Sequence, residues 1–251
     1  MTSFFSINEA AHRYDKHRPR VHSQIFKWLA DSGIELNFNR SIDIACGTGH
    51  STIPLTKISK ETIGIDTSAE MLEKAAEKGL DTKKFSYENI HLLGKFDLIS
   101  TCMAFHWFDE NTAIESYKRA SNKGAIWLIY NFYFGGHSTS NELNDWFYNS
   151  YLNEYPSPKR GAHFATICEN DSSIERIGGK EGVIKINLTE TGLVNYLTTQ
   201  SNIEHAVIQG TSYEEIEENL TNQLVKFKFS NSFDYRYRYD IYRYERQSRN
   251  I

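Results

Sequence analysis

The chain has 251 residues, a net charge of −4 and a pI near 6.1, which exclude the global basic field that recruits nucleic acid. No apolar run approaches the length that spans a bilayer, and residues 1–6 lack the basic start and apolar stretch of a secretory signal. The three cysteines are widely spaced and show neither a disulfide framework nor metal-ligand spacing. We therefore expect a reduced, cytoplasmic α/β protein with no membrane or nucleic-acid partner.

Residues 1–35 are expected to form an N-terminal helical arm, because residues 8–30 mix apolar side chains with charge. His12, His17 and His22 lie near one another in this segment, but their spacing puts them on different faces of a helix. We therefore expect no metal site there.

The most informative stretch is 41–52, where a short apolar strand ends at Gly47 and Gly49 and a helical pattern follows. A strand, a glycine turn and a helix start form the nucleotide-binding element of an open α/β sheet. Thr52 stands where a dinucleotide fingerprint needs a third small residue, which argues against NAD. Asp43, an acid on the first strand, suits a cationic ligand better than a pyrophosphate.

A second strand at 62–66 ends at Asp66, close to the spacing from Gly49 at which an acid binds ribose hydroxyls. Residues 67–70 then predict a capping box that opens a helix, and Gly79 predicts its end.

The rest of the chain continues the alternation of strands and helices, which predicts a parallel sheet with helices on both faces. Residues 132–180 differ, since they are rich in Trp, Tyr and Asn; we expect a lid over the substrate, or aromatics that only pack beneath two helices. The period-two tail should be an antiparallel last strand. The further strands are expected at 84–87, 96–102, 124–131, 183–188 and 233–241, and helices at 190–199, 203–209 and 213–226.

Four motifs in order carry a family resemblance. Residues 43–49 and 64–66 resemble the first two motifs of class I S-adenosylmethionine-dependent methyltransferases. Residues 104–109, Ala-Phe-His-Trp-Phe-Asp, are similar to the trans-aconitate methyltransferase-like branch, and residues 14–19 match its Tyr-Asp-x-x-Arg-Pro element. The resemblance implies a Rossmann-like, seven-stranded, mostly parallel sheet. It also implies a cofactor-binding core at 36–131 and C-terminal helices with closing strands at 181–251.

The same resemblance implies the roles of the site residues. Asp43 would orient the ammonium group of S-adenosylmethionine, and Asp66 would accept from both ribose hydroxyls. The third-strand loop lacks the usual acid, so that either the side chain of Ser86 or the backbone of Tyr87 would meet the adenine. The implied cofactor site is Tyr14, Arg18, Asp43, Ala45, Cys46, Gly47, Gly49, Asp66, Thr67, Met71, Ser86, Tyr87, Thr101 and Met103.

Two residues near the expected acceptor keep alternative roles. His106 is either the general base for a hydroxyl or carbon acid or a structural residue of its turn. Arg18 either reaches a carboxylate of cofactor or substrate or lies on an exposed helix.

The resemblance implies methyl transfer to a small molecule by a monomer or homodimer, with an oxygen of a carboxylate or hydroxyl as the acceptor. The alternatives are a non-catalytic S-adenosylmethionine-binding regulatory or assembly protein, a nicotinamide oxidoreductase and an RNA methyltransferase. The last two are disfavoured by Thr52 and by the charge, respectively. Residues 101–105 also lack the Asn/Asp-Pro-Pro-Tyr motif of enzymes that methylate amino groups of bases.

Overall fold

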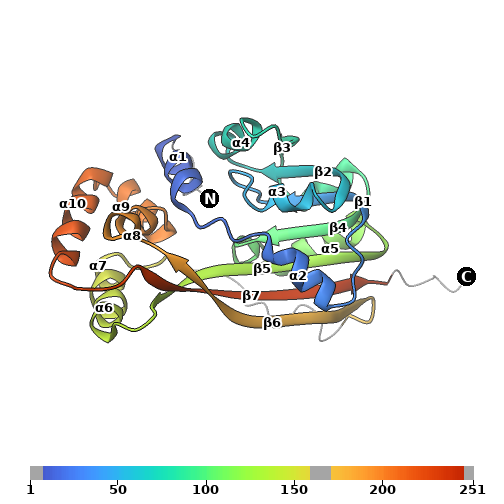
Figure 1. Ribbon diagram of the computed structural model, residues 1–251. Coiled ribbons are helices and arrows are strands. Elements are labelled where there is room, and N and C mark those ends of the chain that lie inside the picture. Colours follow the sequence, from blue (N-terminus) through green and yellow to red (C-terminus); the bar gives the residue numbers. More distant parts are fainter. Residues whose placement is uncertain (1–7, 159–170, 246–251) are drawn as a thin grey trace, which may run out of the picture. The chain divides into compact units, whose positions relative to one another are not determined.

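The computed structural model describes residues 8–158 and 171–245 (Figure 1). Its strands are β1 (Phe38–Ile44), β2 (Ser59–Asp66), β3 (Thr82–Lys84), β4 (Phe96–Cys102), β5 (Ser121–His137), β6 (Ile174–Asn187) and β7 (Ser232–Tyr244). Its α-helices are α1 (Asn8–His17), α2 (Gln24–Asp31), α3 (Thr52–Leu55), α4 (Ala69–Ala76), α5 (Glu110–Ala120), α6 (Asn141–Trp146), α7 (Leu152–Glu154), α8 (Glu190–Leu197), α9 (Ser201–Ile208) and α10 (Tyr213–Leu224). Two 3₁₀ helices, η1 (Tyr87–Leu93) and η2 (Phe105–Trp107), and a π-helix, η3 (Phe147–Tyr151), complete the set. Within these described ranges, no helix combines the length and the apolar character needed to cross a membrane.

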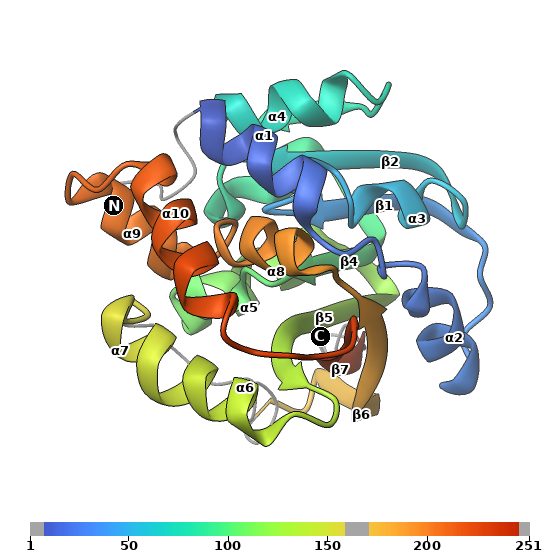
Figure 2. The same ribbon diagram turned by 60° about the vertical axis from the view of Figure 1, so that its left-hand side comes forward.

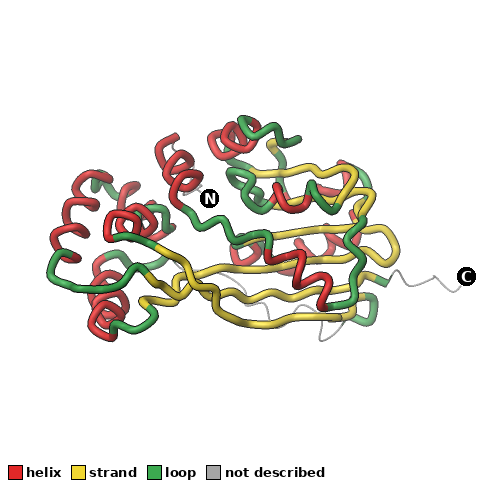
Figure 3. The backbone as a smooth tube through the Cα atoms, viewed as in Figure 1, coloured by secondary structure: helices red, strands yellow, loops and turns green. Residues whose placement is uncertain are grey.

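The strands form a seven-stranded sheet in the order β3-β2-β1-β4-β5-β7-β6, drawn in yellow in Figure 3. The pairs β2–β3, β1–β2, β1–β4 and β4–β5 are parallel. The last two strands run antiparallel: the amide of Leu188 donates to the carbonyl of Asn231, and that of Glu245 to Ser173. The predicted α/β fold with a mostly parallel sheet and an antiparallel last strand is confirmed.

The central strands form the core because their side chains are buried on both faces. Ile42, Ile99 and Trp127 are in register on three neighbouring strands and share one buried face. The continuous apolar run of β5, residues 125–130, is typical of a parallel strand covered by helices on both sides. The indole of Trp127 also donates to the hydroxyl of Ser121, which satisfies its buried N–H group.

The chain divides into two compact units. Of the described residues, the core unit comprises 20–131, 171–181 and 238–245. Of the described residues, the helical unit comprises 8–19, 132–158 and 182–237, and Figure 2 shows its helices α8 and α10 beside each other.

These units differ from the expected boundaries at 35, 131 and 180. The expected arm is divided between them, since the guanidinium of Arg13 on α1 pairs with Glu217 on α10, whereas Trp28 on α2 stacks on Tyr239 in the core unit. Helices α8 to α10 belong to the helical unit and not to the core. Long-range packing of this kind leaves no local signal in the sequence.

Two strands are longer than expected. Strand β5 runs on to His137, and β6 begins at Ile174, inside the segment expected to be the lid. The sequence predicted the end of β6, at 183–188, but not its first part, because most side chains there are at least partly exposed and three glycines interrupt it. One of them, Gly182, lies so close to the ring of Tyr237 that a Cβ atom would come within 2.4 Å of its hydroxyl oxygen.

The helix after β2 begins one residue later than the predicted capping box. Ser68 is the N-cap: its hydroxyl oxygen accepts the amide of Met71 at 3.2 Å. The same hydroxyl donates to Glu70 at 2.9 Å. The helix ends before Gly79, whose φ of +75° is left-handed, as the sequence predicted for its stop.

The packing role of Gly49, the second glycine of the turn after β1, can be tested by substitution. Gly49→Ala would place a Cβ 2.3 Å from Leu80 Cδ1 and 3.2 Å from Ala75 Cβ, at a φ of +85°. Leu80 can rotate, but Ala75 is fixed on α4. We expect Gly49→Ala to lose about 1–3 kcal/mol more of the unfolding free energy than the control Gly79→Ala. The control has nothing within 4 Å and loses only the left-handed penalty of about 1–2 kcal/mol. Equal losses in urea titrations would contradict the packing role.

Candidate functional site

The site lies at the carboxyl edge of the parallel strands in the core unit. Ile44 is in register with Ile65 of β2 and with Thr101 of β4, so the loops that follow β1, β2 and β4 leave the sheet together. Ligands of open α/β sheets bind at this edge. The structure therefore brings together the predicted residues 43–49, 66–71 and 101–103.

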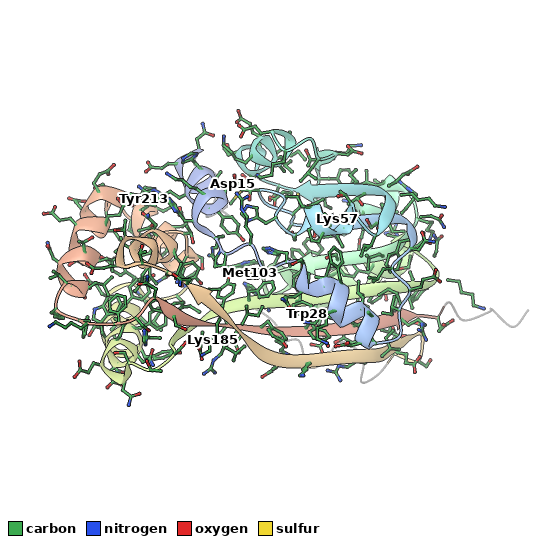
Figure 4. The ribbon with its side chains drawn as sticks, in the orientation of Figure 1. Asp15, Trp28, Lys57, Met103, Lys185 and Tyr213 are labelled. Carbon is green, nitrogen blue, oxygen red and sulfur yellow. The ribbon has the colours of Figure 1, made fainter. Side chains whose placement is uncertain are left out.

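Two residues at this edge have strained backbones. Ala45 and Met103 have φ values of 55° and 54°, and they are the described non-glycine residues with a positive φ. Each such conformation costs about 1–2 kcal/mol. Met103, labelled in Figure 4, is held by its amide, which donates to the carbonyl of Tyr130 at 2.8 Å. Strain of this kind clusters at ligand sites, so it makes the ends of β1 and β4 the candidate ligand-binding part of the edge.

The carboxylate of Asp66 joins two loops. Its Oδ2 accepts the amide of Gly47 at 2.9 Å, and its Oδ1 accepts the amide of Ser68 at 2.9 Å. Burial raises the pKa of Asp66, and the amides of Ser68, Gly47 and Thr67 partly oppose this shift. Each carboxylate oxygen keeps a further lone pair, so Asp66 could accept two hydroxyls of a ligand without releasing either loop.

Asp43 is fully buried on β1. Its Oδ2 accepts the hydroxyls of Ser51 at 2.7 Å and Thr52 at 2.6 Å, whereas its Oδ1 makes no well-formed hydrogen bond in the described residues. Burial raises the pKa of Asp43 to about 6; Thr52, Ser51 and the nearby Ser100 hydroxyl lower it, and the charge of Asp66 adds to the rise. A buried carboxylate with one open oxygen suits a cationic ligand.

The two glycines of the turn have different surroundings. A Cβ on Gly47 would meet only Met71 Sδ, at 4.0 Å, whereas Gly49 is closed in by Leu80 and Ala75. Gly47 therefore leaves room for a ligand against the backbone, and Gly49 serves the packing of α4. Burial raises the pKa of the Cys46 thiol. The backbone amide of Cys46 donates to the carbonyl of Ile65 at 2.9 Å.

Three other predicted residues have side-chain or backbone atoms engaged in contacts within the protein. The Thr101 hydroxyl is buried at 2.6 Å from the Tyr117 hydroxyl, so Thr101 offers a ligand only its backbone. The carbonyl of Tyr87 accepts the hydroxyl of Ser116 at 2.6 Å. Ser86 donates to Glu88, on the 3₁₀ helix that follows. The sequence could not show the contacts of Thr101 and Tyr87, because their partners Tyr117 and Ser116 are contributed by α5.

His106 lies in the 3₁₀ turn after β4, partly buried, with its ring 4.8 Å from that of Trp107. Thr67 is exposed at the end of β2, and Met71 is buried on α4. These positions are compatible with the roles expected of His106, Thr67 and Met71.

Tyr14 and Arg18 belong to the helical unit. The guanidinium of Arg18 donates to the carbonyl of Thr199 at 2.7 Å and lies 4.9 Å from the ring centroid of Tyr14 and 5.5 Å from that of Tyr196. Arg18 therefore does not lie on an exposed helix, which was one of the two alternatives that the sequence left open.

The sequence analysis missed a buried aromatic group in the core unit. The rings of His22 and His50 lie 6.0 Å apart, and His22 lies 6.4 Å from Tyr130. His50 could have been noticed because it directly follows Gly49. In the ranges 8–158 and 171–245, no three His, Cys, Asp or Glu side chains gather as metal ligands would.

Comparison with known proteins assigns the central segment. Residues 42–124 match the family model described as a methyltransferase domain. A candidate methyltransferase of Dictyostelium discoideum is 28% identical over 131 residues, which cover 51% of this chain and 48% of that protein. A 23S rRNA (uracil-C5)-methyltransferase of Vesicomyosocius okutanii is 29% identical over 102 residues, or 22% of its length. The chain thus spans less than half of the length of each of these two relatives.

The structural likeness extends over nearly the whole chain. A candidate type II methyltransferase from Anaeromyxobacter dehalogenans superposes with a TM-score of 0.66, covering 91% of this chain and 97% of that one. At 16% identity this likeness establishes the fold alone.

The raised pKa of Asp43 predicts a specific pH dependence of stability. The folded carboxyl takes up its proton near pH 6, whereas in the unfolded chain it does so near pH 4, so protonation favours the folded state between these values. Between pH 7 and pH 5 the unfolding free energy of the wild type should gain about 1 kcal/mol relative to Asp43→Asn, which cannot titrate. Urea titrations at both pH values measure this difference. Parallel pH profiles of the two proteins would contradict the assignment.

Proposed function

We propose that this protein, whose residues 42–124 form a class I S-adenosylmethionine-dependent methyltransferase domain, transfers the methyl group to an oxygen of a small molecule. The cofactor is S-adenosylmethionine. It supplies a methyl group already activated on a sulfonium, so the chain's task is to bind and orient.

The observation that carries the proposal is the pairing of two acids at one sheet edge. Asp43 has an open, buried oxygen for the ammonium group of the cofactor, and Asp66 has free lone pairs for its ribose hydroxyls. Gly47 leaves the space between them clear. A dinucleotide pyrophosphate would instead meet the negative charge of Asp43.

The remaining contacts follow from the same geometry. Ala45 and Cys46 would present backbone to the methionine part of the cofactor, together with Met103 and the backbone of Thr101. Thr67 and Met71 would flank the adenine, with Ser86 or Tyr87 at its edge. Gly49 supports this site through its packing against Leu80 and Ala75.

For the acceptor we propose a small molecule of the kind methylated by the trans-aconitate methyltransferase-like branch, with an oxygen of a carboxylate or hydroxyl as nucleophile. A carboxylate is ionised at pH 7 and needs no base. A hydroxyl needs one, and His106, in the turn after β4, is the titratable side chain that we assign to this role. Transfer to rRNA, the reaction named for one relative, is disfavoured by the net charge of −4.

Titration calorimetry tests the cofactor site. S-adenosylhomocysteine should bind and NAD should not. Asp66→Ala should weaken S-adenosylhomocysteine at least tenfold, because two charge-assisted hydrogen bonds of about 1.5–3 kcal/mol each are lost. The matched control is Asp97→Ala: Asp97 also accepts two backbone amides, of Asn39 at 3.2 Å and Arg40 at 3.1 Å, but at the start of β4. Binding of NAD without S-adenosylhomocysteine, or equal losses in the two variants, would refute the site.

Turnover separates an enzyme from a non-catalytic binding protein. With a panel of carboxylic acids and alcohols, methyl transfer should be measurable. His106→Ala should retain activity toward carboxylates and lose about 10²–10⁴-fold toward hydroxyl acceptors. Cofactor binding without any transfer across the panel would favour the regulatory alternative.

A further inference from the structure

The helical unit buries an acid that the proposed methyl transfer does not use. Glu204, on α9, is fully buried. The hydroxyl of Tyr213, on α10 and labelled in Figure 4, lies 2.7 Å from Oε1 and 2.6 Å from Oε2 of Glu204. Among the described residues it is the one hydrogen-bond donor to both oxygens. A phenol is neutral at pH 7, so this hydrogen bond does not compensate the charge of an ionised Glu204.

The cation beside this pair is committed to other acids. The guanidinium of Arg13, on α1, lies 4.2 Å from the centroid of the Tyr213 ring. Its Nε donates to Glu9 at 2.9 Å, and its Nη1 donates to Glu217, on α10. No ion pair between described residues includes Glu204. A buried carboxyl with one neutral donor and no cation in contact is the arrangement in which burial favours the protonated form.

Charges on neighbouring elements act on Glu204 from a distance. Burial raises the pKa of Glu204 to about 7. The hydroxyl of Tyr213 and the cations Arg13 and Arg18 oppose this rise, whereas the negative charge of Glu9 adds to it. Because burial outweighs the hydrogen bond and both cations, Glu204 changes its charge close to neutral pH.

We propose that Glu204 is a proton-controlled switch in the packing of α1, α9 and α10: the neutral acid holds these helices together, and its ionisation loosens them. Helix α1 is part of the switch because Arg13 joins it to Tyr213, the hydrogen-bond partner of Glu204, and to Glu217 on the same helix. The switch lies within the helical unit and does not depend on the proposed methyl transfer.

Linkage gives the direction of the effect. Opening of the helices returns Glu204 to water, where its pKa has the ordinary value of 4.5. The closed unit therefore binds the proton more tightly, and its added stability is fully present below pH 4.5 and is lost as the pH rises through about 7. Between pH 6 and pH 8 the equilibrium constant for opening should rise about tenfold and then level off.

Hydrogen exchange of the full chain at pH 5, 6, 7 and 8, corrected for the intrinsic exchange rate, tests the switch. Amide protection in α1 and α9 of the wild type should fall about tenfold between pH 6 and pH 8. Glu204→Gln keeps an acceptor for Tyr213 but cannot titrate, so its protection should change less than twofold. Glu218→Gln, which neutralises an exposed acid of α10, should keep the tenfold fall.

The histidines of these helices do not affect the comparison. His12, His17 and His205 lie on α1 and α9 and are present in the wild type and in both variants. A difference between the wild type and Glu204→Gln therefore belongs to Glu204.

A further variant keeps the test decisive if Glu204→Gln does not fold. Tyr213→Phe retains the carboxyl but removes the hydrogen bond that opposes its raised pKa, so the fall in protection should move to higher pH. Four results would overturn the proposal: constant protection in the wild type, an equal fall in Glu204→Gln, an unmoved fall in Tyr213→Phe, or a fall confined to α9. The last would show that Arg13 does not connect α1 to the switch.

Discussion

The carboxylate of Asp66 is the interaction on which the proposed cofactor site depends. It accepts the amide of Gly47 from the turn after β1 and the amide of Ser68 at the start of α4. The loops follow two parallel neighbouring strands, and Asp66 joins them in addition to the bond from the Cys46 amide to the carbonyl of Ile65. One acid therefore fixes the glycine turn, the start of α4 and the space that Gly47 leaves open.

The same edge carries energetic costs that a ligand can offset. Asp43 is held ionised at neutral pH in a buried position, against its raised pKa, and Ala45 and Met103 keep left-handed backbones. A cationic group at Asp43 would stabilise the charge that burial disfavours. The empty site thus carries a buried charge and strained backbones that cost folding free energy. A ligand with one cationic group would offset this cost through its contact with Asp43, as expected of a preorganised site.

Local features of the sequence predicted much of this edge. Gly47, Asp66 and the cap near residues 67–70 each depend on neighbours within a few positions, so strand, turn and helix signals were sufficient. The parallel direction of β1 to β5, though not their order in the sheet, followed from the alternation of elements, and the strand at the tail followed from its period of two. Strand β6 was too polar and too rich in glycine to give such a signal over its first half.

What the sequence could not predict depends on contacts between distant segments. The packing of Gly49 on Leu80, the bond between Thr101 and Tyr117, and the strained φ of Met103 appear only when the strands are assembled. The surroundings of Arg18 are the extreme case, because Tyr196, Thr199 and Tyr235 are contributed by α8, the loop after it and β7. The motif around residue 18 suggested an anion site, but the tyrosine rings around its guanidinium are a property of the fold.

A crystal structure with bound S-adenosylhomocysteine tests the central claim most directly. The account predicts that the ribose hydroxyls lie on Asp66 while the amides of Gly47 and Ser68 still donate to it, with the ligand's ammonium group at Asp43. Gly47, Ala45 and Met103 should keep their positive φ values. A ligand bound away from this edge, or a turn that must release Asp66 to admit it, would contradict the account.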